Sequence, residues 1–123
     1  MDKGVVIVSD DLIFYKLFET PLLRKIPDLL LFSCKTYQDI DSMFPDTNIQ
    51  LILLDDFKAS ISSIEIIRYL RTKVQTVAPI WFFPEIKTKS YAYKSHEMGA
   101  SILIYRPFDP FKVANEIAAI INR

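Results

Sequence analysis

Short apolar runs, separated by longer and more polar segments, dominate the pattern of this chain. They cover residues 4–8, 29–32, 51–54, 78–83 and 101–105, and none of them contains a charged residue. Uninterrupted runs of this length, rich in aliphatic, β-branched and aromatic residues, are typical of strands buried on both faces of a parallel sheet. The pattern therefore predicts five buried strands.

The segments that follow these runs carry apolar residues at helical spacing. Helices are expected from residue 12, over residues 36–44, 60–73 and 87–98, and from Asp109 or Pro110. Pro21 is expected to interrupt or end the first helix, and Gly99 to cap the fourth. The positions expected to face the core are Leu12, Phe14, Tyr15, Leu17, Phe18 and Leu22, then Ile40, Met43 and Phe44, then Ile61, Ile64, Ile67 and Leu70, and finally Val113, Ile117, Ile120 and Ile121.

This strict alternation of strands and helices predicts a parallel sheet with helices on both faces. A Rossmann-like nucleotide fold and a flavodoxin-like fold with strand order 2-1-3-4-5 both fit it. The chain has only two glycines, Gly4 and Gly99, and its first strand-to-helix turn, SDDL, has none. Without a glycine-rich phosphate loop, the dinucleotide and P-loop classes are excluded. We expect one flavodoxin-like, doubly wound (βα)5 domain over residues 1–123.

Composition narrows the function classes. The 15 basic residues balance the 15 acidic ones, so nucleic-acid binding by this domain is not expected. Cys34 is the one cysteine, which excludes an internal disulfide, and we expect it to be buried in the second strand. No apolar run approaches the ~18 residues that span a bilayer, and the N-terminus does not resemble a signal peptide. We therefore expect a cytoplasmic domain without membrane association.

Acidic residues gather where two of the predicted strands end. Asp10 and Asp11 follow the first strand, and Asp55 and Asp56 follow the third. In an open α/β sheet, ligand chemistry collects at the carboxyl ends of the strands. The simpler alternative is that these acids only begin loops or cap the next helices.

Three segments of the chain resemble a known family. VVIVSDD, LILLDD and GASILIYRPF resemble the ends of the first, third and fifth strands of response regulator receiver domains from bacterial two-component systems. The resemblance covers the whole length and implies a phosphorelay signalling domain rather than an enzyme. It implies that Asp55 accepts a phosphoryl group from a histidine kinase or phosphotransfer protein. It also implies a Mg²⁺ ion held by Asp10, Asp55 and the backbone carbonyl of Phe57.

The chain departs from the family pattern at several positions of this site. Arg106 replaces the lysine that pairs with phosphate, and Pro84 replaces the switch threonine or serine. Ser9 replaces an acidic residue, which should weaken Mg²⁺ binding. Asp11 matches a less essential acid, and Leu103 falls where the family often has its switching aromatic residue. The loop after the acceptor reads FKAS instead of a Met-Pro-Gly-like sequence.

These departures leave two functional classes. In the first, Asp55 works as an atypical phospho-acceptor that reacts slowly. In the second, the domain is a phosphorylation-independent pseudo-receiver that binds a partner protein. Asp10 and Asp55 favour the first class, whereas Ser9, Pro84 and the altered loop after the acceptor favour the second; the first is the function that we expect from the sequence, and the second is its alternative. A flavodoxin-type nucleotide or flavin binder is a third reading, and no phosphate-binding loop supports it.

Further expectations concern the loop after the fifth strand and the surface. By resemblance, the Arg106–Pro107 bond should be cis, and a homodimer or partner contact should use the face of the fourth helix, fifth strand and fifth helix. Tyr91 and Tyr93 are two residues apart on one helix, so they cannot both face the core. His96 is expected at the surface, and the three aromatic residues Trp81 to Phe83 in the core.

Overall fold

The computed structural model describes residues 3–36, 39–43, 48–57 and 62–122. Its strands are β1 (Gly4–Val8), β2 (Leu30–Cys34), β3 (Ile49–Asp55), β4 (Ile80–Phe83) and β5 (Ile102–Leu103), and its helices are α1 (Leu12–Lys25), α2 (Asp39–Met43), α3 (Ser63–Thr72), α4 (Lys89–Met98) and α5 (Pro110–Ile121). The strands form one parallel sheet in the order β2-β1-β3-β4-β5. This confirms the flavodoxin-like fold.

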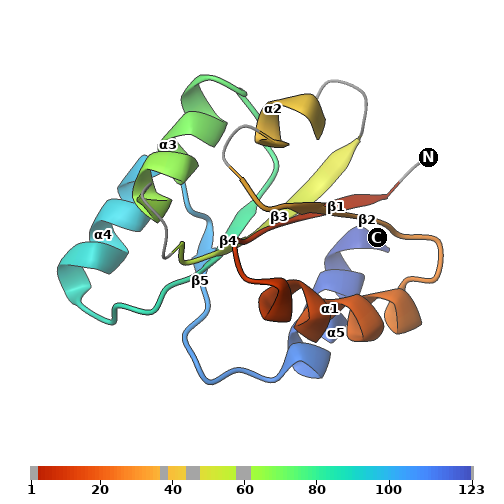
Figure 1. Ribbon diagram of the computed structural model, residues 1–123. Helices are drawn as coiled ribbons and strands as arrows, with labels where there is room; N and C mark the ends of the chain where they lie inside the picture. The colour runs from red at the N-terminus through yellow and green to blue at the C-terminus, as the bar shows by residue number, and fades with distance from the viewer. Residues whose placement is uncertain (1–2, 37–38, 44–47, 58–61, 123) are drawn as a thin grey trace.

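The sheet lies between two layers of helices (Figure 1). Helices α1 and α5 cover one face, and α2, α3 and α4 cover the other. Alternate residues of a strand point to opposite faces, so each central strand contributes to two cores. The three adjacent aromatic residues of β4 divide in this way: Trp81 and Phe83 join the core under α1 and α5, and Phe82 joins the core under α3 and α4.

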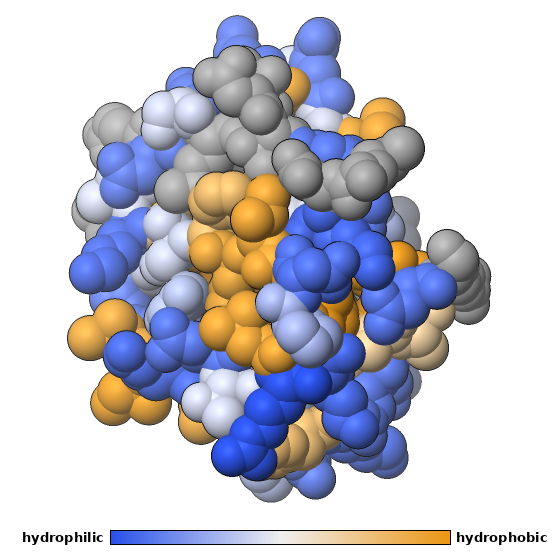
Figure 2. Space-filling view, turned by 90° about the vertical axis from the view of Figure 1, so that its right-hand side faces the viewer, coloured by the Kyte–Doolittle hydropathy of each residue, from blue (hydrophilic) through white to orange (hydrophobic). Residues whose placement is uncertain are grey.

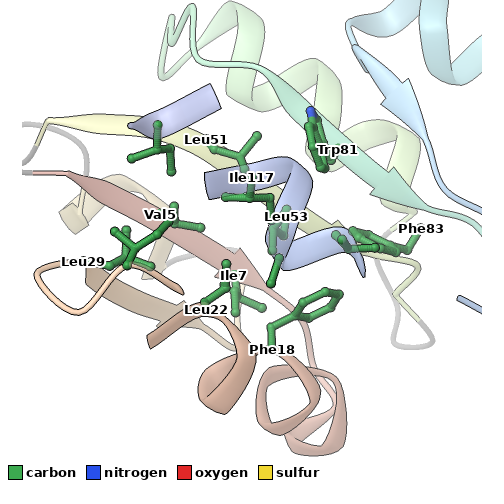
Figure 3. Packing of buried hydrophobic residues seen from close by; sticks show 14 of the residues in the cluster. Val5, Ile7, Phe18, Leu22, Leu29, Leu51, Leu53, Trp81, Phe83 and Ile117 are labelled. Atoms are coloured by element: carbon green, nitrogen blue, oxygen red, sulfur yellow. The ribbon is translucent and has the colours of Figure 1, made fainter. Parts of the chain in front are cut away.

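The core under α1 and α5 is built from both helices and from β1, β3 and β4 (Figure 3), and Leu31 of β2 packs against it. Phe14 and Phe18 of α1 meet Phe83 of β4 with ring centroids 5.1 and 5.4 Å apart. Phe108 stacks on Phe18 at 5.6 Å. These aromatic contacts fix the start of α1 and the segment after β5 at the end of the sheet where the strands terminate.

Several strand and helix limits differ from the sequence-based expectation. Strand β3 extends to Asp55, because Asp55 still pairs with Phe83 of β4. Strand β5 is limited to Ile102–Leu103, although the apolar run is longer. Of the two expectations for Pro21, the structure shows that it lies inside α1 and does not end it, because the helix continues to Lys25. Part of the predicted second and third helices, including Phe44 and Ile61, lies outside the described residues.

Two of the predicted inward faces were also partly wrong. Leu12 and Leu17 are exposed on the flanks of α1, because the residues that enter the core, Phe14, Phe18 and Leu22, recur every four residues along another side of the helix. On α3, the fully buried isoleucines are Ile66 and Ile67, whereas Ile64 is only half-buried. Apolar residues of α1 occur on all sides of the helix, so periodicity alone did not identify its inner face.

Other expectations are confirmed. Cys34 is buried, and burial raises the pKa of its thiol to about 12. His96 is exposed. Gly99 ends α4 with a φ of 130°, and a Cβ there would lie 2.5 Å from Cγ of Arg71. The Arg71 guanidinium donates to the carbonyls of Gly99, Thr76 and Ala78, which ties α3 to the start of β5.

The two ends of the sheet differ in the polarity of their side chains. Figure 2 shows the molecule from the right-hand side of Figure 1, the end at which β1 and β3 begin. Hydrophobic side chains gather near the centre of this face, and hydrophilic side chains lie on both sides of them. Asp10, Asp11, Asp55 and Asp56 lie at the opposite end, where β1 and β3 terminate. No helix within the described ranges is long and apolar enough to cross a membrane.

The central position of Leu53 gives a stability prediction. Leu53 is fully buried and lies between Ile7 of β1 and Trp81 of β4. We expect Leu53→Ala to lower the free energy of unfolding by roughly 2–5 kcal/mol, because it leaves a cavity that the sheet cannot close. Urea unfolding measures this. Val77→Ala, at a side chain that is 95% exposed, is the control and should change stability by less than about 0.5 kcal/mol.

Candidate functional site

Three residues from distant parts of the sequence meet at the end of β3. Ser9 follows β1, Asp55 ends β3, and Arg106 follows β5. The Ser9 hydroxyl donates to Oδ2 of Asp55 at 2.7 Å. Arg106 forms an ion pair with Oδ1 through its Nη2. The sequence singled out all three positions, and the fold brings them together.

Asp55 is almost completely removed from solvent. Its side chain is 4% exposed, and Oδ1 also accepts the backbone N–H of Asp56 at 2.8 Å. Burial raises the pKa of Asp55 above its ordinary value, against the opposing effects of the Ser9 hydroxyl, the Arg106 charge and the Asp56 amide. Both carboxylate oxygens therefore already have hydrogen-bond donors from the chain itself.

Aromatic rings hold the Arg106 guanidinium in place. Its central carbon lies 5.5 Å from the ring centroid of Phe14 and 5.9 Å from that of Phe108, which is the range of cation–π contacts. Nη2 also donates to the carbonyl of Phe83 at 3.3 Å. Nε is buried and has no hydrogen-bond partner among the described residues. The predicted cis bond between Arg106 and Pro107 is confirmed.

Asp56 organises a second polar cluster beside the first. Its Oδ1 accepts the hydroxyl of Ser63 at 2.7 Å, and its Oδ2 accepts the backbone N–H of Glu85 at 2.9 Å. The Tyr91 hydroxyl donates to the same carboxylate at 3.1 Å. Burial, followed by the charge of Asp56, raises the pKa of Tyr91 to about 12. This carboxylate thereby connects β3 with α3, α4 and the loop after β4.

The remaining predicted site residues are spread around these two clusters. Asp10 is exposed, and Asp11 caps α1 by accepting the N–H of Ile13 at 2.9 Å. Pro84 is buried directly after β4, and Leu103 packs into the core under α3 and α4. The backbone N–H of Phe57 donates to the Ser63 hydroxyl at 2.6 Å.

Sequence reasoning missed the roles of Ser63 and Tyr91. Asp56 lies seven residues from Ser63 and 35 residues from Tyr91, and no motif links the three positions. The prediction that Tyr91 and Tyr93 face differently is confirmed, because Tyr91 is half-buried and Tyr93 is 69% exposed. Only the fold shows that the buried member of this pair reaches Asp56.

The donor set is poorly suited to a tightly bound Mg²⁺ ion. Within the described ranges, no three His, Cys, Asp or Glu side chains are grouped closely enough to hold a metal ion. Ser9 contributes a neutral hydroxyl, and Arg106 already places a cation at Oδ1 of Asp55. Mg²⁺ prefers an octahedral shell of oxygen ligands, with one or two carboxylates free to bind it. Asp10, Asp55 and the carbonyl of Phe57 remain the predicted ligands, and the site should be weak.

Comparisons with known proteins agree with this geometry. No protein family model matches the sequence, and no curated protein matches it. The signal receiver domain of the DNA-binding response regulator merR from Colwellia psychrerythraea 34H superposes with a TM-score of 0.84 at 14% identity, over 99% of this chain and all of that one. A CheY-like receiver domain protein from Methanospirillum hungatei JF-1 gives 0.81 at 16%, over 99% and 95% of the two chains.

The BeF3-activated receiver domain of DrrB, a response regulator of Thermotoga maritima, gives a TM-score of 0.80 at 18% identity over the full length of both chains. This chain has the fold of a response regulator receiver domain. In this chain, the side chains of Ser9, Asp55 and Arg106 meet at the carboxyl end of β3. The sequence identities are only 14–18%, so the comparisons show the fold alone. Any functional argument must therefore rest on the side chains at this site.

The raised pKa of Asp55 gives a pH prediction. The native state holds the Asp55 proton more tightly than the unfolded chain, whose carboxyl has the ordinary pKa of 3.8. Wild type should therefore lose stability relative to Asp55→Asn as the pH rises from 3.8 to the raised pKa, and the difference should be constant above it. Urea unfolding from pH 3.5 to 8 measures this. A difference that instead favours wild type with rising pH would show that the ion pair with Arg106 outweighs burial.

Tyr91 gives a second prediction from this site. Tyr91→Phe removes a donor from the buried carboxylate of Asp56, so we expect a loss of about 1–3 kcal/mol in unfolding free energy. Tyr93→Phe, on the same helix but exposed, should have little effect. Wild type should lose stability between pH 10.0 and about 12, because the native state retains the phenol proton, and Tyr91→Phe should lose less. Equal stability of the two variants at pH 7 would contradict this account.

Proposed function

We propose that this chain acts in two-component signalling as an atypical receiver that works without phosphorylation, as a protein-interaction module. The observation that carries the proposal is the enclosure of Asp55, whose two oxygens are bonded by Ser9, Arg106 and the Asp56 amide. A side chain that is 4% exposed offers little access to a phosphodonor. We regard the domain as a signalling module of the cytoplasm rather than an enzyme.

Two features support this proposal. Phosphoryl transfer depends on positioning and on neutralising charge, and here Arg106 already neutralises the acceptor itself. Freeing Asp55 means breaking a largely buried ion pair, which is costly when one partner is left without the other. Pro84 has no hydroxyl with which to bond a phosphoryl group at the end of β4. Without phosphorylation, the buried polar side-chain atoms of this site therefore all have hydrogen-bond partners, apart from Nε of Arg106.

The Nε atom of Arg106 supports a second candidate function, in which Asp55 is a slow phospho-acceptor. Nε of Arg106 is a buried donor without a partner in the described part of the chain. If a carboxylate oxygen of Asp55 attacked the phosphorus of a phosphohistidine, the N–P bond would break and an acyl phosphate would form. The guanidinium could then turn its Nε and Nη2 donors onto two phosphoryl oxygens. The donor would be a histidine kinase or a phosphotransfer protein.

The surface for a partner protein is proposed at α4, β5 and α5. Tyr93 on α4, Ile102 in β5, Tyr105 after it and Phe111 on α5 are 40–69% exposed. Large hydrophobic side chains that stay exposed along one side of a domain mark interaction sites more often than single ones do. Tyr91 does not belong to this surface, since it is committed to Asp56.

One titration separates the two functions. The full chain is monitored by NMR while beryllofluoride, a phosphoryl mimic, is added with millimolar Mg²⁺. We expect no shifts for wild type or Asp55→Asn, and we expect Arg106→Lys, which loses the planar forked contact, to gain shifts around Asp55. Acetyl phosphate labelling of the same variants gives an independent measure.

Two outcomes would change the interpretation. Saturable shifts around Asp10, Asp55 and Arg106 in wild type, absent in Asp55→Asn, would establish the slow phospho-acceptor instead. Shifts that reach Tyr105 and α5 would show in addition that a switch operates without a hydroxyl at Pro84.

A further inference from the structure

The outer edge of β2 is an unprotected strand edge. Within the described residues, β2 pairs with β1 alone. Natural edge strands are usually protected by charges, proline, bulges or short length. The opposite edge strand, β5, has only two residues, but β2 has five, with the sequence LLFSC and a continuous register against β1. Within the described residues, β2 therefore carries no charge, proline or bulge and is not short.

The backbone of β2 shows which groups face outward. The N–H of Leu30 donates to the carbonyl of Lys3 at 2.8 Å, and the carbonyl of Cys34 accepts from Ser9 at 3.0 Å. Peptide groups of a strand point alternately to its two sides, so Leu31 and Ser33 direct their N–H and C=O groups away from β1. An extended segment placed alongside β2 would satisfy these groups.

Apolar side chains accompany this edge. Leu30 is 39% exposed, and Leu31 and Phe32 are only half-buried. Helix α1 connects β1 with β2, so it lies on one face of the sheet near these two strands (Figure 1). Its Leu12 and Leu23 are 54% and 39% exposed, and their spacing of three turns places them on the same flank of the helix.

The charges at the two ends of α1 indicate that the segment alongside β2 comes from a second copy of this chain. The exposed Asp10 and the capping Asp11 stand at its start, and Arg24 and Lys25 lie in its last turn. A second copy placed antiparallel to β2 also places its α1 antiparallel to the first. The acidic end of each helix then faces the basic end of the other, twice in the same interface. This arrangement is self-complementary, as a two-fold symmetric interface must be.

We propose that β2 is a homodimerisation edge, at which two copies of this chain pair their β2 strands antiparallel into one continuous sheet. The two-fold axis passes beside Phe32, so that Leu31 of each copy pairs with Ser33 of the other and exchanges both backbone hydrogen bonds. Phe32 then faces Phe32 of the second copy in a non-hydrogen-bonded pair. This interface is separate from the surface proposed at α4, β5 and α5.

Sedimentation of the full chain over a concentration series tests the dimer. We expect a monomer–dimer equilibrium that Ser33→Pro weakens at least about tenfold, because proline removes an outward N–H that β1 does not use. Leu30→Lys, which places a charge at the edge, should act in the same direction if Ser33→Pro fails to fold. Tyr93→Glu is the matched control at the other surface and should leave the dimer unchanged. The double variant Arg24→Glu, Lys25→Glu should weaken the dimer and remove its salt dependence.

Cross-linking tests the register. The Cα atoms of a non-hydrogen-bonded antiparallel pair are about 4.5 Å apart, within reach of a disulfide. Phe32→Cys should therefore give a disulfide-linked dimer under mild oxidation, whereas Tyr93→Cys should not. Wild type that stays monomeric at all concentrations would overturn the proposal. A dimer that survives Leu30→Lys and is lost in Tyr93→Glu would overturn it as well and assign the interface to α4, β5 and α5.

Discussion

Two adjacent carboxylates are buried where the central strand β3 leaves the core, and the surrounding structure depends on keeping both of them hydrogen-bonded. A carboxylate removed from water needs donors or a cation close by. Asp55 receives them from Ser9 after β1 and from Arg106 after β5. Asp56 receives them from Ser63 of α3, Tyr91 of α4 and the loop after β4. Together the two side chains connect most of the elements at this end of the sheet.

The two clusters are joined through one peptide group. The backbone N–H of Asp56 donates to Asp55, while the Asp56 side chain holds Tyr91. Asp55 is therefore hydrogen-bonded to the residue whose side chain holds Tyr91 of α4. Pro84 has no hydroxyl, and Asp56 with Tyr91 connects the site to α4 instead. The connection is built from the carboxylate of Asp56 and the phenol of Tyr91, which no motif in the sequence links.

The sequence predicted the parts of this protein that depend on local pattern. Uncharged apolar runs located all five strands, and the absence of glycine at the turn SDDL selected the fold class. Resemblance located Asp55 and Arg106. The inner face of α1 was not predictable, because Leu12 and Leu17 are as apolar as Phe14 and Phe18, and only packing against β4 separates them. The bonds of Asp56 depend on how α3 and α4 are placed by the sheet, and no local signal encodes that.

The two edge strands of the sheet offer different kinds of contact to another chain. Strand β5 has only two residues, so the partner surface proposed beside it depends on side chains such as Tyr93 and Ile102. Strand β2 offers backbone groups in addition to apolar side chains, and a backbone edge is best satisfied by another strand. The two edges are separated by β1, β3 and β4, so one can pair with a second copy while the other binds a partner. Because Cys34 of β2 accepts from Ser9, which in turn donates to Asp55, a dimer at β2 would be one residue away from the buried carboxylate.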